Sequence, residues 1–400
     1  MGEQQTTLRN EENLMERYTS ATLISTAANF IMNREETFTH TYRTYIKLRE
    51  NGSLTLKFWH SNAVDSTWDK GEMARAGLLG GPWMIEAAYV ADGGKEPNGA
   101  VESGTQTALT FGGSRSREVA PGETFWSDPV SVDLPEGHYL AFTWTIRTMQ
   151  PGKSFPYNVE QMLVTAYDAP GNHADEESVG SFVLSDNMQV LPAFIGYEKQ
   201  VNKRLLFFGD SITQGVRTAK DGYEYWVARI GEGLGPQYGV WNLGSGWARA
   251  YDAATNTAWL NKLKQQQGLT SQETQIVLAL GVNDLDIGER TAEQLLGDLQ
   301  SIISVLKEKD ASTEIILFTV PPFNFTEQRE QEWRKVNETI RTASLPGVSR
   351  VFDIAAILSQ PAPNEHVEQP KFMSNQFDPH PNGIAGKAVA EAFLKWYRSN

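Results

Sequence analysis

Leu205-Leu206-Phe207-Phe208 runs directly into Gly209-Asp210-Ser211-Ile212-Thr213, and this stretch decides the fold of the C-terminal half. The four apolar residues show no polar residue at alternate positions, which is typical of a strand buried on both faces. Gly209 and Asp210 then end the run, and segment Tyr223–Leu234 has the apolar spacing of a helix. The stretch therefore predicts a strand, a tight turn and a helix of an α/β sheet.

The same rhythm continues to the end of the chain. Further apolar runs of strand length follow at Gly239–Leu243, Gln275–Leu280, Glu314–Val320 and Arg350–Ile354. Helical spacing recurs at Thr291–Lys309, Glu327–Ala343 and Ile384–Tyr397. Apolar strands that alternate with helices predict a parallel sheet covered by helices on both faces. In such sheets the functional groups gather beyond the carboxyl ends of the strands.

The first half of the chain has a different texture. From about Thr37 to Ala193, short apolar runs are separated by turn residues. Thr41–Leu48 and Ser53–Phe58 flank Asn51-Gly52, and this pattern predicts a β-hairpin. Many short strands with frequent turns favour an antiparallel β-sandwich of jelly-roll type. We therefore expect a sandwich domain over residues 1–198 and an α/β domain over residues 199–400.

Composition narrows the classes of partner. The formal net charge of −14 argues against nucleic acid, because phosphate binding needs a basic face. The chain has no cysteine, so disulfides and thiolate metal sites are excluded. Neither the apolar core of a signal peptide nor a window of 18 apolar residues is found, which predicts a cytoplasmic protein without membrane contact. A homo-oligomer is compatible with the sequence.

Four polar segments fall after strand ends or before the last helix. Ser211 follows the first strand, where a nucleophile would have backbone N–H groups nearby, and an N-cap is the alternative. Segment Trp241–Trp247 holds two glycines, which fit either a ligand contact or a plain turn. Asn283 follows the third strand and suits an oxyanion donor or an Asx-turn. His380 is either a base held by Asp378 or a surface histidine.

Together these segments resemble the four sequence blocks of the SGNH (GDSL-like) hydrolases. The resemblance covers residues 204–397 and rests on Gly209–Thr213, the glycine block, Gly281-Val282-Asn283-Asp284 and His380. It implies a flavodoxin-like three-layer α/β/α fold with strand order 2-1-3-4-5. The first half is similar to the sandwich that precedes some two-domain bacterial members.

The resemblance also implies ester hydrolysis through an acyl-enzyme, without metal or cofactor. Ser211 would attack the carbonyl and His380 would take its proton. The backbone N–H of Ser211, the N–H of a glycine in the second block and the Asn283 side chain would hold the oxyanion.

The sequence departs from the family pattern in two places. The family's usual acid position, three residues before the histidine, holds Phe377, so we expect Asp378 to serve as the acid; a backbone carbonyl that orients the ring is the alternative. The glycine block is also shifted by one residue. We expect Gly246 to supply the oxyanion N–H, with Gly244 or Trp247 as alternatives.

The leading functional hypothesis is an esterase that removes acetyl groups from carbohydrate. The resemblance to the family implies this substrate, and exposed aromatic side chains would stack on sugar rings. A short-chain or lipase-like esterase acting on small soluble esters is the second hypothesis. A glycan-binding protein without catalysis is the third. The stacking candidates, each of which could equally be a core residue, are Trp59, Trp83, Trp126, Trp144 and Trp247.

Overall fold

The computed structural model describes residues 16–65, 77–159, 163–186, 188–256, 260–267, 273–343 and 345–399. The described chain divides into two compact units, one holding residues 18–65 and 78–199 and the other residues 16–17, 77 and 200–399. The domain limits of 1–198 and 199–400 remain a prediction, which limited proteolysis would test. No helix among the described residues is long and apolar enough to cross a membrane.

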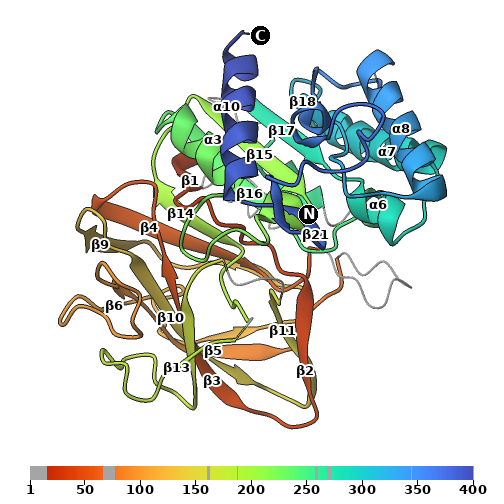
Figure 1. The fold of residues 1–400 in the computed structure, drawn as a ribbon. Helices are drawn as coiled ribbons and strands as arrows, with labels where there is room; N and C mark the ends of the chain where they lie inside the picture. The colour runs from red at the N-terminus through yellow and green to blue at the C-terminus, as the bar shows by residue number, and fades with distance from the viewer. Residues whose placement is uncertain are drawn as a thin grey trace. The chain divides into compact units, whose positions relative to one another are not determined.

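The first unit is an antiparallel β-sandwich, as expected (Figure 1). Aromatic rings fill the space between its sheets: Phe58 and Phe142 come from different sheets and their ring centroids lie 5.0 Å apart. One sheet has the order β1 (Tyr18–Ser20), β14 (Phe194–Glu198), β4 (Gly52–Ser61) and β8 (Thr124–Trp126), and β9 (Val130–Leu134) also pairs with β4. The other has the order β13 (Val183–Leu184), β12 (Ala166–Pro170), β3 (Thr39–Ile46), β10 (Leu140–Thr148), β5 (Trp83–Asp92) and β6 (Thr107–Ala108), and β7 (Arg117–Val119) pairs with β5. Strands β2 (Phe30–Arg34) and β11 (Gly152–Tyr157) form a separate pair.

The expected hairpin between Thr41–Leu48 and Ser53–Phe58 is wrong. Strand β3 pairs with β10 and β12, whereas β4 pairs with β14, β8 and β9 in the opposite sheet. Asn51-Gly52 therefore joins two sheets, and Gly52 has a φ of 106° there. The alternating pattern predicted two strands correctly, but alternation specifies a buried face and not the neighbouring strand.

The second unit contains the expected parallel sheet. Its order is β16 (Tyr238–Gly244), β15 (Lys203–Gly209), β17 (Glu273–Ala279), β18 (Glu314–Phe318) and β19 (Arg350–Phe352). All neighbours in this sheet are parallel, so the strand order 2-1-3-4-5 is confirmed. Strand β15 lies between β16 and β17, which brings the loops after these three strands to one edge of the sheet.

The helices of this unit form two packed groups (Figure 1). The first group holds α3 (Trp226–Leu234), α9 (Ile354–Leu358) and α10 (Gly383–Ser399), and the second holds α4 (Ala250–Thr255), α5 (Asn261–Lys264), α7 (Ala292–Lys309) and α8 (Glu327–Thr342). With the sheet they form the three-layer α/β/α arrangement. The remaining short elements are α2 (Ser211–Gln214), α6 (Val282–Asp286), β20 (Met373–Asn375) and β21 (Asp378–Pro381).

An aromatic cluster holds α3 and α10 against the sheet. The Trp226 ring of α3 lies 5.4 Å from both Phe207 of β15 and Phe318 of β18. Phe393 of α10 packs 6.2 Å from Phe207 and 5.9 Å from Phe318. Burial of such large rings contributes several kcal/mol and fixes the helix that follows His380 along the chain.

Candidate active site

Ser211 opens the short helix α2 directly after strand β15. Asp210 is the N-cap of this helix, because its carboxylate accepts a hydrogen bond of 2.9 Å from the Ile212 N–H. Ser211 is therefore the first helical residue and not the cap, and its own N–H has no partner within the helix. Glycine is required at position 209, since an added Cβ would lie 2.0 Å from Thr213 Oγ1 and 2.7 Å from the Ala279 carbonyl.

His380 approaches Ser211 from strand β21, although 169 residues separate the two in the chain. The His380 Nε2 atom lies 2.9 Å from Ser211 Oγ, within hydrogen-bond distance. Strand β21 pairs with β20. Asn382 then caps the next helix, because its side-chain oxygen accepts from the N–H groups of Ile384 and Ala385. The segment before the last helix is thus a small hairpin.

Asp378 lies on the other side of the imidazole. Its Oδ1 atom is 2.6 Å from His380 Nδ1 and also accepts from the His380 backbone N–H at 3.1 Å. Side chains two residues apart on a strand point to the same face, so Asp378 and His380 point the same way along β21. Strand geometry therefore explains how an acid two residues before the histidine can contact the imidazole. Phe377, in the position three before the histidine, is 86% exposed.

The electrostatics of this pair suit a neutral imidazole beside an ionised acid. Burial lowers the pKa of His380 below its ordinary value, and the Asp378 carboxylate opposes part of that effect. Burial alone would raise the pKa of Asp378, but hydrogen bonds from His380 and Arg217 hold it below its ordinary value. At neutral pH the site therefore holds a neutral acceptor next to the Ser211 hydroxyl.

The expected oxyanion donors have partners of their own. The Gly246 N–H donates to Gln214 Oε1 at 2.8 Å, and the Gly244 N–H donates to Asn242 Oδ1 at 2.9 Å. The Gly246 N–H can donate to an oxyanion only if its hydrogen bond to Gln214 is first broken. The Asn283 amide donates one hydrogen to the Ala248 carbonyl at 3.1 Å, which leaves its second hydrogen.

Two buried carboxylates brace the loops around the site. Asp284 accepts from the N–H groups of Ala250 and Tyr251, which ties the loop after β17 to helix α4. Burial raises the pKa of Asp284 to about 6 and that of Asp210 to about 7. Trp247 between these loops has a φ of 60°, a left-handed conformation that is rare for a bulky residue and is concentrated at functional sites.

The structure thus joins Ser211, His380 and Asp378 by hydrogen bonds, and it places Gly246 and Asn283 in the loops after β16 and β17. Their roles remain a prediction. Sequence reasoning missed Arg217 and Gln214, which contact Asp378 and Gly246. No spacing could have found Arg217, because its partner is 161 residues away.

Most of the tryptophans considered for sugar stacking belong to the core. Trp59, Trp83 and Trp144 are 0–2% exposed, so their faces are not available to a ligand. Trp126 and Trp247 are partly exposed. Phe377, which directly precedes Asp378 in the chain, is by contrast 86% exposed.

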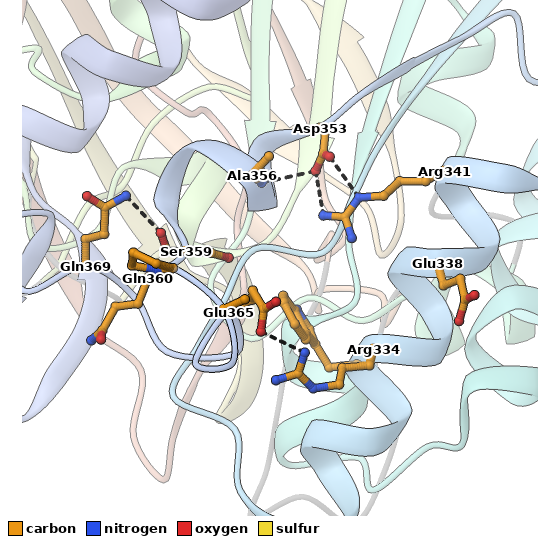
Figure 2. Close-up of a pocket in the computed structure, with 12 residues that line it drawn as sticks. Arg334, Glu338, Arg341, Asp353, Ala356, Ser359, Gln360, Glu365 and Gln369 are labelled. Atoms are coloured by element: carbon orange, nitrogen blue, oxygen red, sulfur yellow. Dashed lines mark hydrogen bonds and ion pairs between the residues drawn. The ribbon is translucent and has the colours of Figure 1, made fainter.

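A hollow of about 700 Å³ lies between α8, α9 and the segment 359–369 (Figure 2). Its two arginines are already neutralised: Arg334 pairs with Glu365, and Arg341 forms two bonds to Asp353. Neither Ser211 nor His380 lines this cavity. It is therefore distinct from the candidate site.

Comparison with known proteins identifies the second unit. Residues 207–383 match the model of the GDSL-like Lipase/Acylhydrolase family. The chain matches no curated protein.

Several solved structures are similar at low identity. A carbohydrate esterase family 3 protein from Talaromyces cellulolyticus is 16% identical over 49% of this chain and 97% of its own, with a TM-score of 0.34. A GDSL-like lipase from Bacteroides thetaiotaomicron is 19% identical over 49% of this chain and 88% of its own, with a TM-score of 0.36. A mutant of a family two carbohydrate esterase from Clostridium thermocellum is 11% identical over 96% of this chain and 97% of its own, with a TM-score of 0.38.

The family match spans the loops that carry Ser211, Asn283 and His380. Residues 207–383 are therefore a GDSL-like lipase/acylhydrolase domain, which is the domain type of a carboxylic ester hydrolase.

Proposed function

We propose that this esterase works through an acyl-enzyme on Ser211 and that its natural substrates are carbohydrates carrying O-acetyl groups. The observation that carries the mechanism is the continuous hydrogen-bonded series from Ser211 Oγ through the His380 imidazole to Asp378. A nucleophile, a base and a group that orients the base are the parts that covalent ester hydrolysis requires.

In the acylation step Ser211 Oγ attacks the carbonyl carbon of the ester while His380 Nε2 takes the hydroxyl proton. The oxyanion accepts hydrogen bonds from the Ser211 N–H and the Asn283 amide, and from Gly246 once Gln214 has moved away. The C–O bond then breaks, and the leaving alcohol receives the proton from His380. Asp378 stabilises the transient imidazolium.

In the deacylation step a water molecule takes the place of the alcohol. His380 removes one proton from this water, whose oxygen attacks the acyl carbon. The bond to Ser211 Oγ breaks and Ser211 regains its proton from His380, which releases acetic acid.

Two observations support a carbohydrate substrate over a small soluble ester. Phe377, the residue before Asp378 in the chain, has an exposed ring, and Trp247 is partly exposed in the loop after β16. Aromatic faces of this kind stack on the apolar faces of pyranose rings. A glycan-binding protein without catalysis is disfavoured, because the hydrogen-bonded series would then have no use.

The direct test measures acetate released from acetylated xylan and acetylated oligosaccharides, beside a series of p-nitrophenyl esters of increasing chain length. We expect the acetylated saccharides to give the highest kcat/KM, with activity on p-nitrophenyl esters falling beyond the shortest acyl chains. Higher kcat/KM on long acyl chains than on any acetylated saccharide would favour the lipase-like alternative. Glycan binding without hydrolysis of any ester would contradict the mechanism.

We expect kcat/KM to rise with pH through the titration of His380, because only the neutral imidazole can accept the Ser211 proton. The lowered pKa of His380 places the half-maximal rate below about pH 6.5. The profile should be measured with p-nitrophenyl acetate under kcat/KM conditions. A rate that is independent of pH between about 5 and 8 would contradict a base of this type.

Phe377→Ala is expected to lower kcat/KM on acetylated oligosaccharides by about 2- to 10-fold, the magnitude of one aromatic contact. Activity on p-nitrophenyl acetate should stay within about twofold, because the leaving group is too small to need the ring. Leu184→Ala is the matched control, since Leu184 is 56% exposed on β13 in the other unit. Equal losses on both substrates would argue against a sugar contact.

A further inference from the structure

Arg217 forms an ion pair with Asp378, the acid of the candidate triad. Its Nε atom donates to Asp378 Oδ2 at 2.7 Å, while Asp378 Oδ1 is occupied by His380. The two oxygens of one carboxylate are thus held by two different cations or donors. The Arg217 side chain is 48% exposed and that of Asp378 is 20% exposed, so the ion pair lies at the surface end of the triad.

The turn after α2 explains how Arg217 reaches this position. Gly215 ends the helix with a φ of 106°, and its N–H and that of Val216 both donate to the Ser211 carbonyl. Thr218 closes the next turn through its N–H and hydroxyl, which both donate to the Gly215 carbonyl. Arg217 between them is forced to a φ of 73°. A left-handed backbone is uncommon at a residue with a long side chain and indicates a specific constraint.

This contact completes a closed ring between two chain segments. Ser211 bonds to His380, His380 to Asp378, and Asp378 to Arg217, which follows Ser211 by six residues in the same loop. The hairpin β20–β21 is therefore tied to the nucleophile's loop at two points. The bond from Arg217 restrains the Asp378 carboxylate and, through it, the direction of the imidazole.

The charges around the pair come from few groups. Arg217 acts from the turn after α2, and its positive charge contributes to lowering the pKa of His380. Glu368, buried before β20, has its pKa raised to about 9, first by burial and then by Asp378, so it is uncharged near neutral pH. From the segment after β18, Phe323 presents an uncharged ring 5.2 Å from His380. Arg217 is thus the main cationic influence on the pair among these groups.

We propose that Arg217 is a positioning residue of the triad, which fixes the Asp378 carboxylate and tunes the imidazole that Asp378 holds. This inference rests on the proposed acyl-enzyme mechanism but not on the proposed carbohydrate substrate. An exposed ion pair such as Arg217–Asp378 adds little to folding stability, so we expect its substitution to change catalysis more than stability.

The test compares Arg217→Ala, Arg217→Gln and Arg217→Lys in the full chain, with p-nitrophenyl acetate as substrate. We expect Arg217→Ala to lower kcat by about 10-fold at an unchanged KM. The low-pH side of its pH–rate profile, called the acid limb below, should move to higher pH by about half a unit. Loss of the cation raises the pKa of His380. Arg217→Gln should show the same shift of the acid limb.

Arg217→Lys separates charge from geometry. It keeps the cation, so its acid limb should stay at the wild-type pH while kcat takes an intermediate value. Arg341→Ala is the matched control, because Arg341 is 39% exposed and its ion pair with Asp353 does not touch the triad. All variants should keep a melting temperature within a few degrees of the wild type.

Two results would overturn the proposal. One is an Arg217→Ala variant whose kcat and acid limb both match the wild type. The other is a loss of kcat without movement of the acid limb and without recovery in Arg217→Lys, which would indicate a structural role. Ser211→Ala, measured in parallel, distinguishes a failure of the acyl-enzyme mechanism from a failure of the role of Arg217. If Ser211→Ala remains active, the mechanism and the role of Arg217 both fail; if it is inactive, only the role of Arg217 is at stake.

Discussion

Ser211→Ala is expected to lower kcat by about 10⁴-fold or more on every ester the enzyme accepts. The substitution removes the oxygen that forms the acyl-enzyme, and His380 Nε2 loses its partner at 2.9 Å. Substrate binding and the oxyanion donors remain, so a small residual rate above that of water is also expected. The KM for a saccharide ester should change little.

The measurement combines steady-state kinetics with covalent labelling. A fluorophosphonate should add one adduct to the wild type, mapped by mass spectrometry to the peptide containing Ser211, and none to Ser211→Ala. Ser245→Ala is the matched control: its residue follows strand β16, which pairs with the Ser211 strand, and its hydroxyl is buried without a partner among the described residues. Replacing such a hydroxyl by hydrogen is close to neutral for folding, and labelling should persist.

Labelling of Ser211→Ala at the wild-type rate would place the nucleophile elsewhere. Absence of labelling and of hydrolysis in the wild type, with glycan binding retained, would instead support the binding protein. These outcomes separate an inactive fold from an enzyme with another nucleophile.

The α/β unit was predictable because its signals are local. A continuous apolar run such as Leu205–Phe208 is typical of a strand that is buried on both faces. Glycine is required at position 209 because Thr213 and Ala279 pack closely against it. The candidate nucleophile and the candidate base were predicted from the ordered sequence blocks. Pairing in the sandwich was not predictable, since Thr39–Ile46 and Gly52–Ser61 join different sheets despite the turn between them.

The finer geometry of the site depends on contacts between distant segments. The pairing of Arg217 with Asp378 and of Gln214 with Gly246 leaves no periodic mark in the sequence. The exposure of the aromatic residues could not be predicted from the sequence either. Trp83 lies in the core at 0% exposure, whereas Phe377 is 86% exposed. Composition identifies a large apolar ring but not the side of the fold on which it lies.

Asp378→Asn is expected to lower kcat by about 10³- to 10⁴-fold with little change in KM. The asparagine amide would present an N–H to His380 Nδ1, which favours the tautomer that carries its proton on Nε2. That tautomer cannot accept the Ser211 proton, although every heavy atom keeps its place. Steady-state kinetics at pH 8, where the wild-type imidazole is neutral, would measure the loss without interference from titration.

Glu368→Gln is the matched control for this substitution. Glu368 is a second buried carboxyl group, whose pKa is raised by burial and by the nearby Asp378 charge, so it is protonated near neutral pH. Its replacement by the isosteric amide should change kcat by less than about threefold. A loss as large as that of Asp378→Asn would show that general disturbance of the hairpin, and not the tautomer, determines the rate.

A double substitution tests the spacing itself. If the acid could act from three residues before His380, Phe377→Asp should restore activity to Asp378→Asn. We expect no recovery, because residue 377 lies in the turn before β21 with its side chain in solvent, whereas residues 378 and 380 share one face of the strand. Recovery would mean that the hairpin rearranges easily. A loss of less than about 10-fold in Asp378→Asn would show instead that a backbone carbonyl orients the imidazole and that Asp378 is dispensable.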